Sequence, residues 1–309
     1  MTSPTIQAVR RRKASPATVF EVLENGLWRT WGDESQPPLG LPPVPAWRET
    51  APAIAAATDA RLPFAPMSFR DFMLSEQHVI DASRAMTRRY LPDVYEQATA
   101  YETANGSTFP EFKPSPLWYA QPIYYMSNAL TFVPTGTDIT APDYTHDLDY
   151  ELELGFVIGK PLLNATPAEA AEAIVGYVVL NDLSARSVQF DEMRSGFGPQ
   201  KAKHFKSSMS DVIVAAAEIG DPAALRAEVK INGKVVTRSS TAGMQHTLGE
   251  ALAHASRSEQ LYPGELFGTG TIAGCSGIES GTLPKVGDLL ELSIENIGTI
   301  THKIIGNDK

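Results

Sequence analysis

Residues 149–186 read DYELELGFVIGKPLLNATPAEAAEAIVGYVVLNDLSAR, and this stretch decides the fold. It contains two apolar runs with strand periodicity, and carboxylates stand in or directly after both. Glu151 and Glu153 are two residues apart, so on a strand their side chains point to the same face. Asp182 comes at the end of the second run. We therefore expect the three carboxylates to lie on two strands that are joined through a helix.

The segment between the two runs has the capping signals of a helix. Thr166, Pro167, Ala168 and Glu169 match a capping box with proline at the first helical position. We expect the helix to continue through residues 170–175 and Gly176 to close it.

Two carboxylates on one face of an apolar segment repel each other and lose hydration. A hard divalent cation such as Mg²⁺ or Ca²⁺ is the usual remedy, because both ions take oxygen ligands. An alternating Glu-Leu-Glu-Leu pattern is also typical of a strand with one solvated face. The fragment by itself leaves both interpretations open.

Composition limits the classes of partner. The chain has 309 residues, of which 43% are hydrophobic, so it can form one large domain with a small appendage. Its formal net charge of −10 disfavours nucleic acid as a partner. We expect no membrane association, because no apolar run approaches the length of a membrane span. The single cysteine, Cys275, excludes an intrachain disulfide and fits a reducing, cytoplasmic location.

Residues 1–62 differ from the rest, and we interpret them as a small N-terminal subdomain and linker, followed by a main domain over residues 63–309. Residues 5–23 have the pattern of short strands, and proline-rich and alanine-rich runs follow at 36–45 and 51–60. A disordered tract is the alternative for this region.

The main domain mixes helical and strand patterns. From Ser68 the spacing is helical as far as Pro92, which would place Asp71 and His78 on one helix face, seven residues apart. Residues 93–148 are expected to form loops with short strands. Four later features have clear signals: a strand at 212–216, a hairpin at 228–237 around Asn232-Gly233, a capping box at 247–250, and paired strands at 289–295 and 299–305.

Four motifs occur in order: DFMLSEQH at 71–78, LDYELEL at 148–154, NDLSARSVQ at 181–189 and GTGTIAGCSGIE at 268–279. With them the chain resembles the fumarylacetoacetate hydrolase family, and more closely its fumarylacetoacetase-like C–C bond hydrolases. The resemblance implies a mixed α/β, strand-rich fold. Its main domain would be a β-roll or β-sandwich with a few helices, usually assembled as a homodimer.

The resemblance also implies roles for residues of this chain. The metal ligands would be Asp71, Glu151, Glu153 and Asp182, holding Mg²⁺, with Ca²⁺ or Mn²⁺ as alternatives. The catalytic residues would be His78 as base, Glu279 as its orienting partner, Lys203, Arg186 and Gln189. Tyr125, Thr271 and Met73 would line the substrate pocket together with Arg186 and Gln189.

Two departures from the family pattern affect these roles. The alignment at Lys203 needs a shift of one residue, so Lys201 or Lys206 could take its place. Met73 stands where fumarylacetoacetase has a tyrosine, which suggests a less polar pocket wall. The substrate would be a small diketone or diketo acid.

Three hypotheses follow. The first is a metal-dependent hydrolase that cleaves a C–C bond of a 1,3-diketone or acylpyruvate. The second is a decarboxylase or enol–keto tautomerase of a 2-oxo acid on the same site. The third is a non-catalytic, ligand-binding member of the family. Hydrolysis additionally needs a water-activating pair, so it predicts that Glu279 lies within hydrogen-bond reach of His78.

Overall fold

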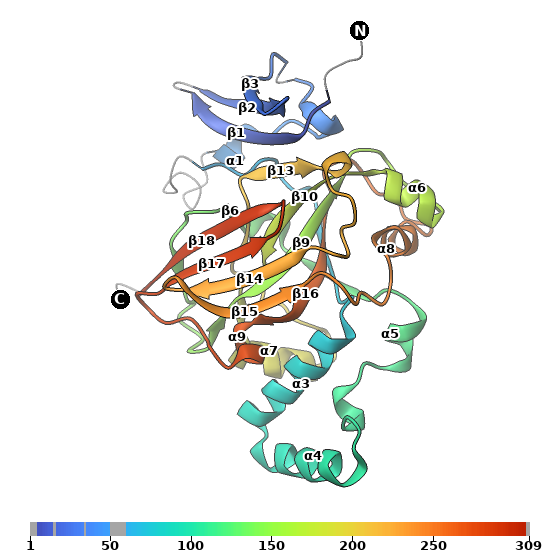
Figure 1. Cartoon of the computed structure of the whole chain (residues 1–309), viewed down its shortest axis with the longest axis vertical. Coiled ribbons are helices and arrows are strands. Elements are labelled where there is room, and N and C mark those ends of the chain that lie inside the picture. The colour runs from blue at the N-terminus through green and yellow to red at the C-terminus, as the bar shows by residue number, and fades with distance from the viewer. Residues whose placement is uncertain (1–4, 15–16, 34, 50–59, 307–309) are drawn as a thin grey trace.

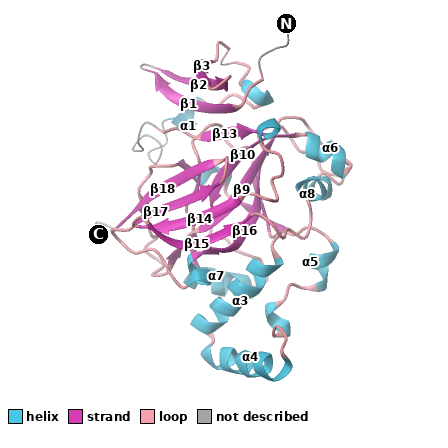
Figure 2. Cartoon of the chain, in the orientation of Figure 1, coloured by secondary structure: helices cyan, strands magenta, loops and turns pink. Residues whose placement is uncertain are grey.

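The computed structural model describes residues 5–14, 17–33, 35–49 and 60–306 (Figure 1). Residues 51–59 of the alanine-rich run therefore lie outside the described residues. Strands fill the centre of the molecule and helices lie around them (Figure 2). Among the described residues, no helix is both long enough and apolar enough to cross a membrane.

The larger sheet is built around β9 (Glu151–Ile158) and β10 (Ile174–Asn181), which pair antiparallel. Its strand order is β3 (Leu27–Thr30), β2 (Ala17–Glu24), β1 (Ala8–Ala14), β13 (Val212–Ala215), β10, β9, β16 (Leu266–Ser276), β4 (Phe69–Phe72) and β5 (Tyr124–Ser127). A short strand, β12 (Ser207–Met209), also pairs with β10, and β6 (Phe132–Pro134) pairs with β12. The N-terminal strands extend this sheet, because β1 pairs with β13.

The second sheet has the order β15 (Lys234–Ser240), β14 (Arg226–Ile231), β17 (Leu289–Ile294), β18 (Gly298–Ile305) and β7 (Ile139–Thr140). A separate short pair joins β8 (Leu148–Asp149) to β11 (Ser184–Ala185). The main core lies between the two large sheets: Leu152, Leu154 and Phe156 of β9 share one cluster with Leu290 and Leu292 of β17. The expected mixed, strand-rich fold is confirmed.

Strand β9 is buried on both faces, and this explains why two of its carboxylates lie inside the protein. Its even-numbered residues pack into the core between the sheets. Its odd-numbered residues face the other way: Val157 joins a second apolar cluster, whereas Glu151 and Glu153 are buried without an apolar role. The alternation in the sequence therefore places two carboxylates inside the protein rather than in solvent.

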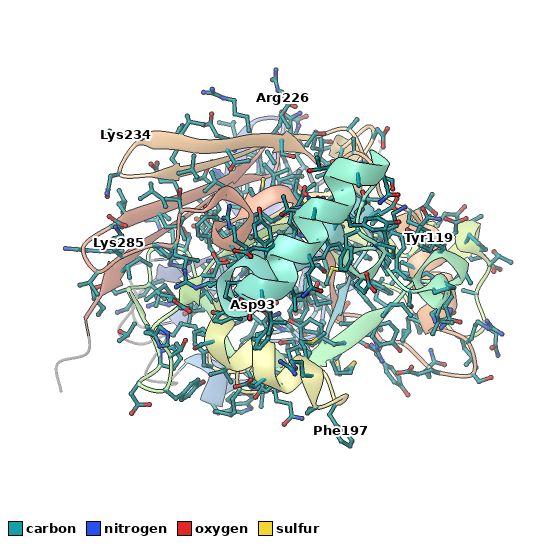
Figure 3. All side chains as sticks on the ribbon, turned by 90° about the horizontal axis from the view of Figure 1, so that it is seen from below. Asp93, Tyr119, Phe197, Arg226, Lys234 and Lys285 are labelled. Carbon is teal, nitrogen blue, oxygen red and sulfur yellow. The ribbon has the colours of Figure 1, made fainter. Side chains whose placement is uncertain are left out.

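The longest helices, α3 (Glu76–Tyr90) and α4 (Pro92–Asn105), form a pair at the lower end of Figure 1. On one side of the sheets α6 (Pro167–Glu172) packs against α8 (Leu248–Ala255). The remaining α-helices are short: α1 (Ala46–Glu49), α5 (Pro116–Ala120), α7 (Arg186–Arg194) and α9 (Gly277–Ser280). Seen from the lower end, Asp93 of α4 and Phe197 of the loop after α7 both lie on this face (Figure 3).

Several local predictions are confirmed. Both capping boxes form, at Thr166 with Glu169 and at Thr247 with Glu250. The hairpin between β14 and β15 turns at Asn232 and Gly233, both with positive φ as a type I′ turn requires. The strand at 212–216 is β13, and β17 pairs with β18 as expected.

Three predictions are wrong. The segment from Ser68 is not helical at its start, because residues 69–72 pair with both β16 and β5, and Ser75 caps the helix that follows. Asp71 is therefore a strand residue. Residues 92–105 form a helix instead of a loop, with proline at its first position and Gly106 at its end. Gly176 does not close α6 but lies in β10, where a Cβ would meet Ile213 Cγ2 at 2.3 Å.

Candidate active site

Three carboxylates from different parts of the larger sheet meet at its centre. Asp71 comes from β4, Glu153 from β9, and Asp182 from the residue after β10. One oxygen of each lies within 4.8 Å of the others, and all three side chains are buried. The structure thus brings these three carboxylates together, as we expected.

Gly268 of β16 makes the room for this cluster. It lies in register with Asp71 on one side and with Gly155 of β9 on the other. A Cβ at Gly268 would stand 2.5 Å from Glu153 Oε2 and 2.6 Å from Asp71 Oδ1, so only glycine lets the two carboxylates converge. Sequence reasoning did not identify Gly268, although it is the first residue of the GTGTIAGCSGIE motif.

The chemistry of the three groups fits a divalent cation. Asp71 Oδ1 and both oxygens of Glu153 have no hydrogen-bond partner among the described residues. Burial and the neighbouring Asp182 carboxylate raise the pKa of Asp71 to about 8. Burial and the Asp71 carboxylate raise the pKa of Glu153 well above its ordinary value. Unpaired, clustered carboxylate oxygens are the ligand set that Mg²⁺, Mn²⁺ or Ca²⁺ takes.

The Gly268→Ala variant is expected to lose cation binding, because its methyl group would push apart two of the three carboxylates. We expect the parent protein, stripped of metal, to gain thermal stability when Mg²⁺ or Mn²⁺ is added, and the variant to gain none. The control is Gly220→Ala, since a Cβ there meets nothing within 4 Å. A full metal-induced shift in Gly268→Ala would show that the cation binds elsewhere.

Glu151 was expected to be a fourth ligand, but in the structure its carboxylate is paired with two cations. Lys203 Nζ donates to Glu151 Oε2 and also lies 2.6 Å from Asp182 Oδ2. Arg186 pairs with Glu151 Oε1 at 2.7 Å. Burial raises the pKa of Glu151, but Lys203 and Arg186 outweigh burial and lower it to about 2. Glu151 thus links the carboxylate cluster to fixed positive charge.

Lys203 is the lysine at the site. Its side chain is buried, and the carboxylates of Asp182 and Glu151 hold its pKa above the ordinary value despite burial. Lys201 is exposed, with its ammonium group 5.6 Å from the Tyr144 ring centroid. Lys206 is half-buried and has a pKa lowered by burial. Neither Lys201 nor Lys206 lines the cavity, and among the described residues neither forms an ion pair with the carboxylate cluster, as Lys203 does.

Asp149 is a residue of the site that sequence reasoning missed. Its Oδ2 accepts from Arg186 Nε at 2.7 Å, and its oxygens also accept from the backbone N–H groups of Gly277 and Ile278. It therefore fixes Arg186 and, at the same time, the short helix α9 that carries Glu279. The sequence could have indicated this role, because positions 149, 151 and 153 are all acidic and alternate positions of a strand share one face.

His78 and Glu279 form a buried pair. His78 Nδ1 lies 3.0 Å from Glu279 Oε2, and both side chains are at most 3% exposed. The predicted contact is present. Burial alone would lower the pKa of His78, but the Glu279 carboxylate outweighs burial and raises it. Burial raises the pKa of Glu279, but His78 outweighs burial, so the pKa of Glu279 lies below its ordinary value.

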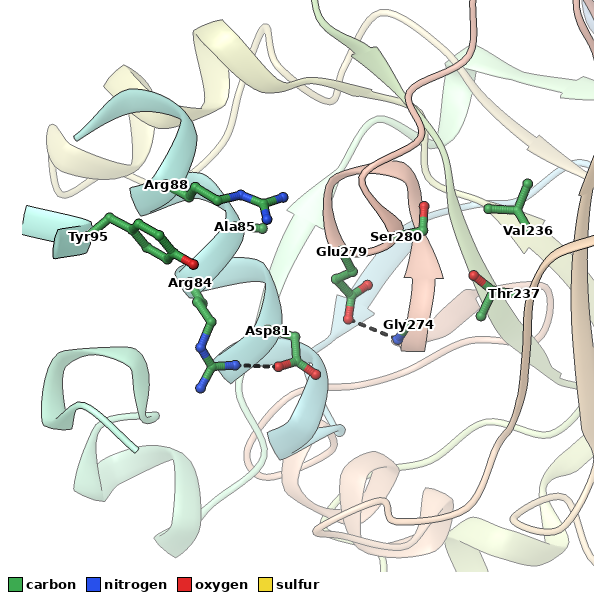
Figure 4. Close-up of a pocket in the computed structure, with 10 residues that line it drawn as sticks. All are labelled: Asp81, Arg84, Ala85, Arg88, Tyr95, Val236, Thr237, Gly274, Glu279 and Ser280. Carbon is green, nitrogen blue, oxygen red and sulfur yellow. Dashed lines mark hydrogen bonds and ion pairs between the residues drawn. The ribbon is translucent and has the colours of Figure 1, made fainter. Parts of the chain in front are cut away.

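The position of Glu279 is fixed by its own loop (Figure 4). Its Oε1 accepts from the backbone N–H of Gly274 at 2.9 Å, and its Oε2 accepts from Ser276 Oγ at 2.6 Å. Ser276 also caps α9 by accepting from the Glu279 N–H. The carboxylate therefore has little freedom, and it orients the imidazole ring from a rigid support.

One cavity of about 580 Å³ is lined by six of these residues: Asp71, His78, Glu151, Glu153, Arg186 and Lys203. Asp182, Asp149 and Glu279 contact these residues from behind the lining. The remaining predicted pocket residues line it as well: Tyr125, Thr271, Gln189 and Met73. Tyr125 donates its hydroxyl proton to Asp182 Oδ2, and Gln189 Oε1 accepts from Arg186 at 2.7 Å. Thr271 of β16 lies in register with Glu153 of β9. The structure thus gathers every predicted site residue in or directly beside this cavity.

The chain is similar to several known proteins. The family model described as fumarylacetoacetate (FAA) hydrolase C-terminal matches residues 94–305. The human protein named oxaloacetate tautomerase FAHD1, mitochondrial, is 28% identical over 186 residues, which are 60% of this chain and 81% of that protein. The Xenopus laevis oxaloacetate tautomerase fahd2, mitochondrial, is 30% identical over 186 residues, covering 60% of this chain and 58% of that protein.

Two solved structures share the fold over nearly the whole chain. A fumarylacetoacetate hydrolase from the psychrophilic Exiguobacterium antarcticum has a TM-score of 0.69 and 22% identity, covering 97% of this chain and 100% of the other. A 2-hydroxyhepta-2,4-diene-1,7-dioate isomerase from Mycobacterium marinum has a TM-score of 0.67 and 22% identity, with 98% and 100% covered. Since the family model matches more than half of the sequence, the chain belongs to the fumarylacetoacetate hydrolase family.

Proposed function

We propose that this protein is a metal-dependent hydrolase that cleaves a C–C bond of an acylpyruvate or related 1,3-diketone. The observation that carries the proposal is the buried His78–Glu279 pair, whose His78 lines the same cavity as Asp71 and Glu153. A base with a fixed orienting carboxylate is the arrangement that activates water. Ketonisation of an enol moves a proton from oxygen to carbon and does not need an activated water.

The cation would be held by Asp71, Glu153 and Asp182, with Glu151 as a further candidate ligand. When bound, a divalent cation such as Mg²⁺ supplies positive charge that polarises a carbonyl group and stabilises developing negative charge on its oxygen. Lys203 and Arg186 add fixed positive charge at the same end of the cavity. Both are held in place by buried carboxylates, so they need little reorganisation during the reaction.

The reaction consumes one water. His78 removes a proton from water, and the hydroxide oxygen bonds to the acyl carbon of R–CO–CH₂–CO–COO⁻. The bond between the acyl carbon and the CH₂ group breaks, and its electron pair stays with the CH₂ carbon. His78 returns its proton to that carbon, which gives R–COOH and pyruvate. Glu279 stabilises the imidazolium between the two proton transfers.

The second candidate function is enol–keto tautomerisation of a 2-oxo acid such as oxaloacetate. It is favoured by the names of the human and Xenopus relatives, which are oxaloacetate tautomerases. Tautomerisation moves a proton and leaves the carbon skeleton intact, so it does not require water to be activated. A decarboxylase of a 2-oxo acid would use the same polarising groups and release CO₂.

A panel of acylpyruvates and 1,3-diketones tests the proposal. Each compound is incubated with metal-stripped protein and with protein reloaded with Mg²⁺ or Mn²⁺, and loss of enol absorbance is followed. We expect turnover only with metal, and we expect cleavage products by NMR. Loss of enol absorbance with an intact carbon skeleton would favour the tautomerase, and no turnover of any compound would contradict the hydrolase.

The pH profile of Glu279→Gln gives a test with a defined sign. The neutral imidazole is the active form of the base, so kcat/KM should rise with pH through the pKa of His78. Glu279 raises that pKa, and burial lowers it. Removing the carboxylate should therefore move the acid limb of the profile to lower pH, together with a loss in kcat. An unchanged acid limb would mean that another group titrates.

A homodimer in the cytoplasm remains a proposal that rests on the family resemblance. Light scattering on the purified protein should give a mass twice the 33.4 kDa of one chain. A mass of a single chain at micromolar concentration would contradict the dimer.

A further inference from the structure

Two chemically different groups of side chains line the cavity. One group consists of the carboxylates, Lys203, Arg186 and His78 described above. The other group, the apolar wall, comes from α3, α7 and the segments after β4 and before β5, and α3 also contributes the polar Ser83 and Thr87 to the lining. The residues of the apolar wall are Met73, Val79, Ala82, Met86, Ile123, Phe190 and Met193. The activity proposed so far uses none of these side chains.

These apolar side chains are not part of the protein core. Among the described residues, none of the seven belongs to a cluster of buried hydrophobic residues. On α3, Val79, Ala82 and Met86 follow spacings of three and four, so they share one helix face. The buried Ile80 instead packs in a cluster with Phe112. The face of α3 that carries these three apolar residues is therefore turned to the cavity, together with Ser83 and Thr87, and a ligand can cover it.

The cavity's buried cations are already used. Arg186 pairs with Asp149 and Glu151, and Lys203 pairs with Glu151 and Asp182. Two further charged residues line the cavity, the exposed Arg194 and Glu111, and they have opposite signs. The Arg194 guanidinium carbon lies 5.2 Å from the Phe190 ring centroid. A second carboxylate on the substrate would thus find no buried cation free at the apolar wall.

Three of the seven apolar residues are methionines, from three different segments. Methionine is unbranched and polarisable, so it adapts to ligands of different shape. The chain has 8 methionines, and a grouping of three around one cavity gives that wall an adaptable surface. Such a wall suits alkyl chains of several lengths or an aromatic ring, rather than one rigid polar group.

We propose that Met73, Met86, Met193 and the adjoining apolar residues form a subsite for an alkyl or aryl tail of the substrate. The assignment of this tail to the acyl group R rests on the proposed hydrolase function. The existence of the subsite does not, because it follows from the cavity wall alone. The substrate class is then an acylpyruvate whose acyl group is apolar, and not a dicarboxylic acid.

Binding of uncleavable probes tests the subsite separately from turnover. The probes are pyruvate, 2-oxohexanoate and 2-oxooctanoate, which lack the second carbonyl group, and 2-oxoadipate, which ends in a carboxylate. With Mg²⁺-loaded protein in a calorimeter, affinity should rise up to about fourfold for each methylene that becomes buried. The 2-oxoadipate should bind more weakly than 2-oxohexanoate. Equal affinities across the series, or tightest binding of 2-oxoadipate, would overturn the inference.

A pair of methionine variants locates the effect. Met193 lines the cavity and is 54% exposed, whereas Met67 is 58% exposed and is not part of the cavity wall. Met193→Glu should remove most of the gain in affinity from pyruvate to 2-oxooctanoate and leave pyruvate binding nearly unchanged. Met67→Glu should leave the whole series unchanged. The ratio of affinities within one preparation does not depend on the fraction of folded protein. An unchanged ratio in Met193→Glu would contradict the assignment.

Turnover separates this inference from the proposed function. Among acylpyruvates, kcat/KM should increase from the acetyl to the hexanoyl compound in the parent protein, and Met193→Glu should flatten that increase. Cleavage that favours a short or carboxylate-ended acyl group would overturn the subsite and leave the hydrolase intact. Tail-dependent binding without any cleavage would support the subsite and contradict the hydrolase.

Discussion

His78→Ala is expected to lower kcat for C–C cleavage by about 10²–10⁴-fold, the usual contribution of a general base. The imidazole is the only histidine ring among the residues that line the described cavity. Its Nδ1 lies 3.0 Å from the Glu279 carboxylate, which forms no other ion pair within the part of the chain that the structure describes. Without the imidazole, water must attack as a neutral molecule. Metal binding should change little, because Asp71, Glu153 and Asp182 are untouched.

The measurement is steady-state cleavage of the best acylpyruvate, together with the metal-induced shift in Tm of the stripped protein. His254→Ala is the matched control, since His254 lies on α8 and lines no part of the cavity. Nearly full cleavage activity in His78→Ala would rule out the proposed base.

Glu153→Gln is expected to change stability in opposite directions with and without metal. In the metal-free protein three buried carboxylates lie within 4.8 Å, and neither Glu153 oxygen has a hydrogen-bond partner among the described residues. Burial and the Asp71 carboxylate raise the pKa of Glu153, so the metal-free fold must either keep a repelled charge there or take up a proton. Glutamine requires neither, so the stripped variant should melt above the stripped parent. With Mg²⁺ present the parent should gain about 2.7 kcal/mol at a concentration of 100 Kd, and the variant should gain almost nothing.

Differential scanning calorimetry with and without Mg²⁺ gives both effects. A gain of that size corresponds to a shift in Tm of several degrees for a chain of this length. Activity of Glu153→Gln should fall to background. If the variant keeps the metal-induced shift, the cation does not use Glu153, and the carboxylate cluster has another purpose.

The sequence predicted the part of the fold that depends on local periodicity. The alternation at 151–158 places leucines between the two sheets and glutamates on the opposite face, as β9 shows. Capping boxes and the Asn232-Gly233 turn are also local, and they formed where expected. The charge cluster followed from the same period, because two strands that pair bring Glu153 and Asp182 together.

What could not be predicted depends on contacts between distant segments. Residues 69–72 have a helical pattern, but pairing with β16 and β5 makes them a strand. Glu151 and Glu153 are equivalent in the sequence, yet only Glu151 meets Lys203 and Arg186. The contact between His78 and Glu279, separated by 201 positions in the chain, was expected only from the family resemblance. The family model itself begins at residue 94, after His78.

The central claim is that His78, oriented by Glu279, activates water for C–C cleavage. Proton NMR of one acylpyruvate incubated with Mg²⁺-loaded protein tests it most directly, because ketonisation and cleavage give different carbon skeletons in the same sample. We expect the parent to produce pyruvate and the acyl carboxylate in equal amounts. His78→Ala should produce them at least a hundredfold more slowly. If the parent converts the enol to the ketone and leaves the carbon chain intact, the hydrolase account is wrong and the tautomerase takes its place.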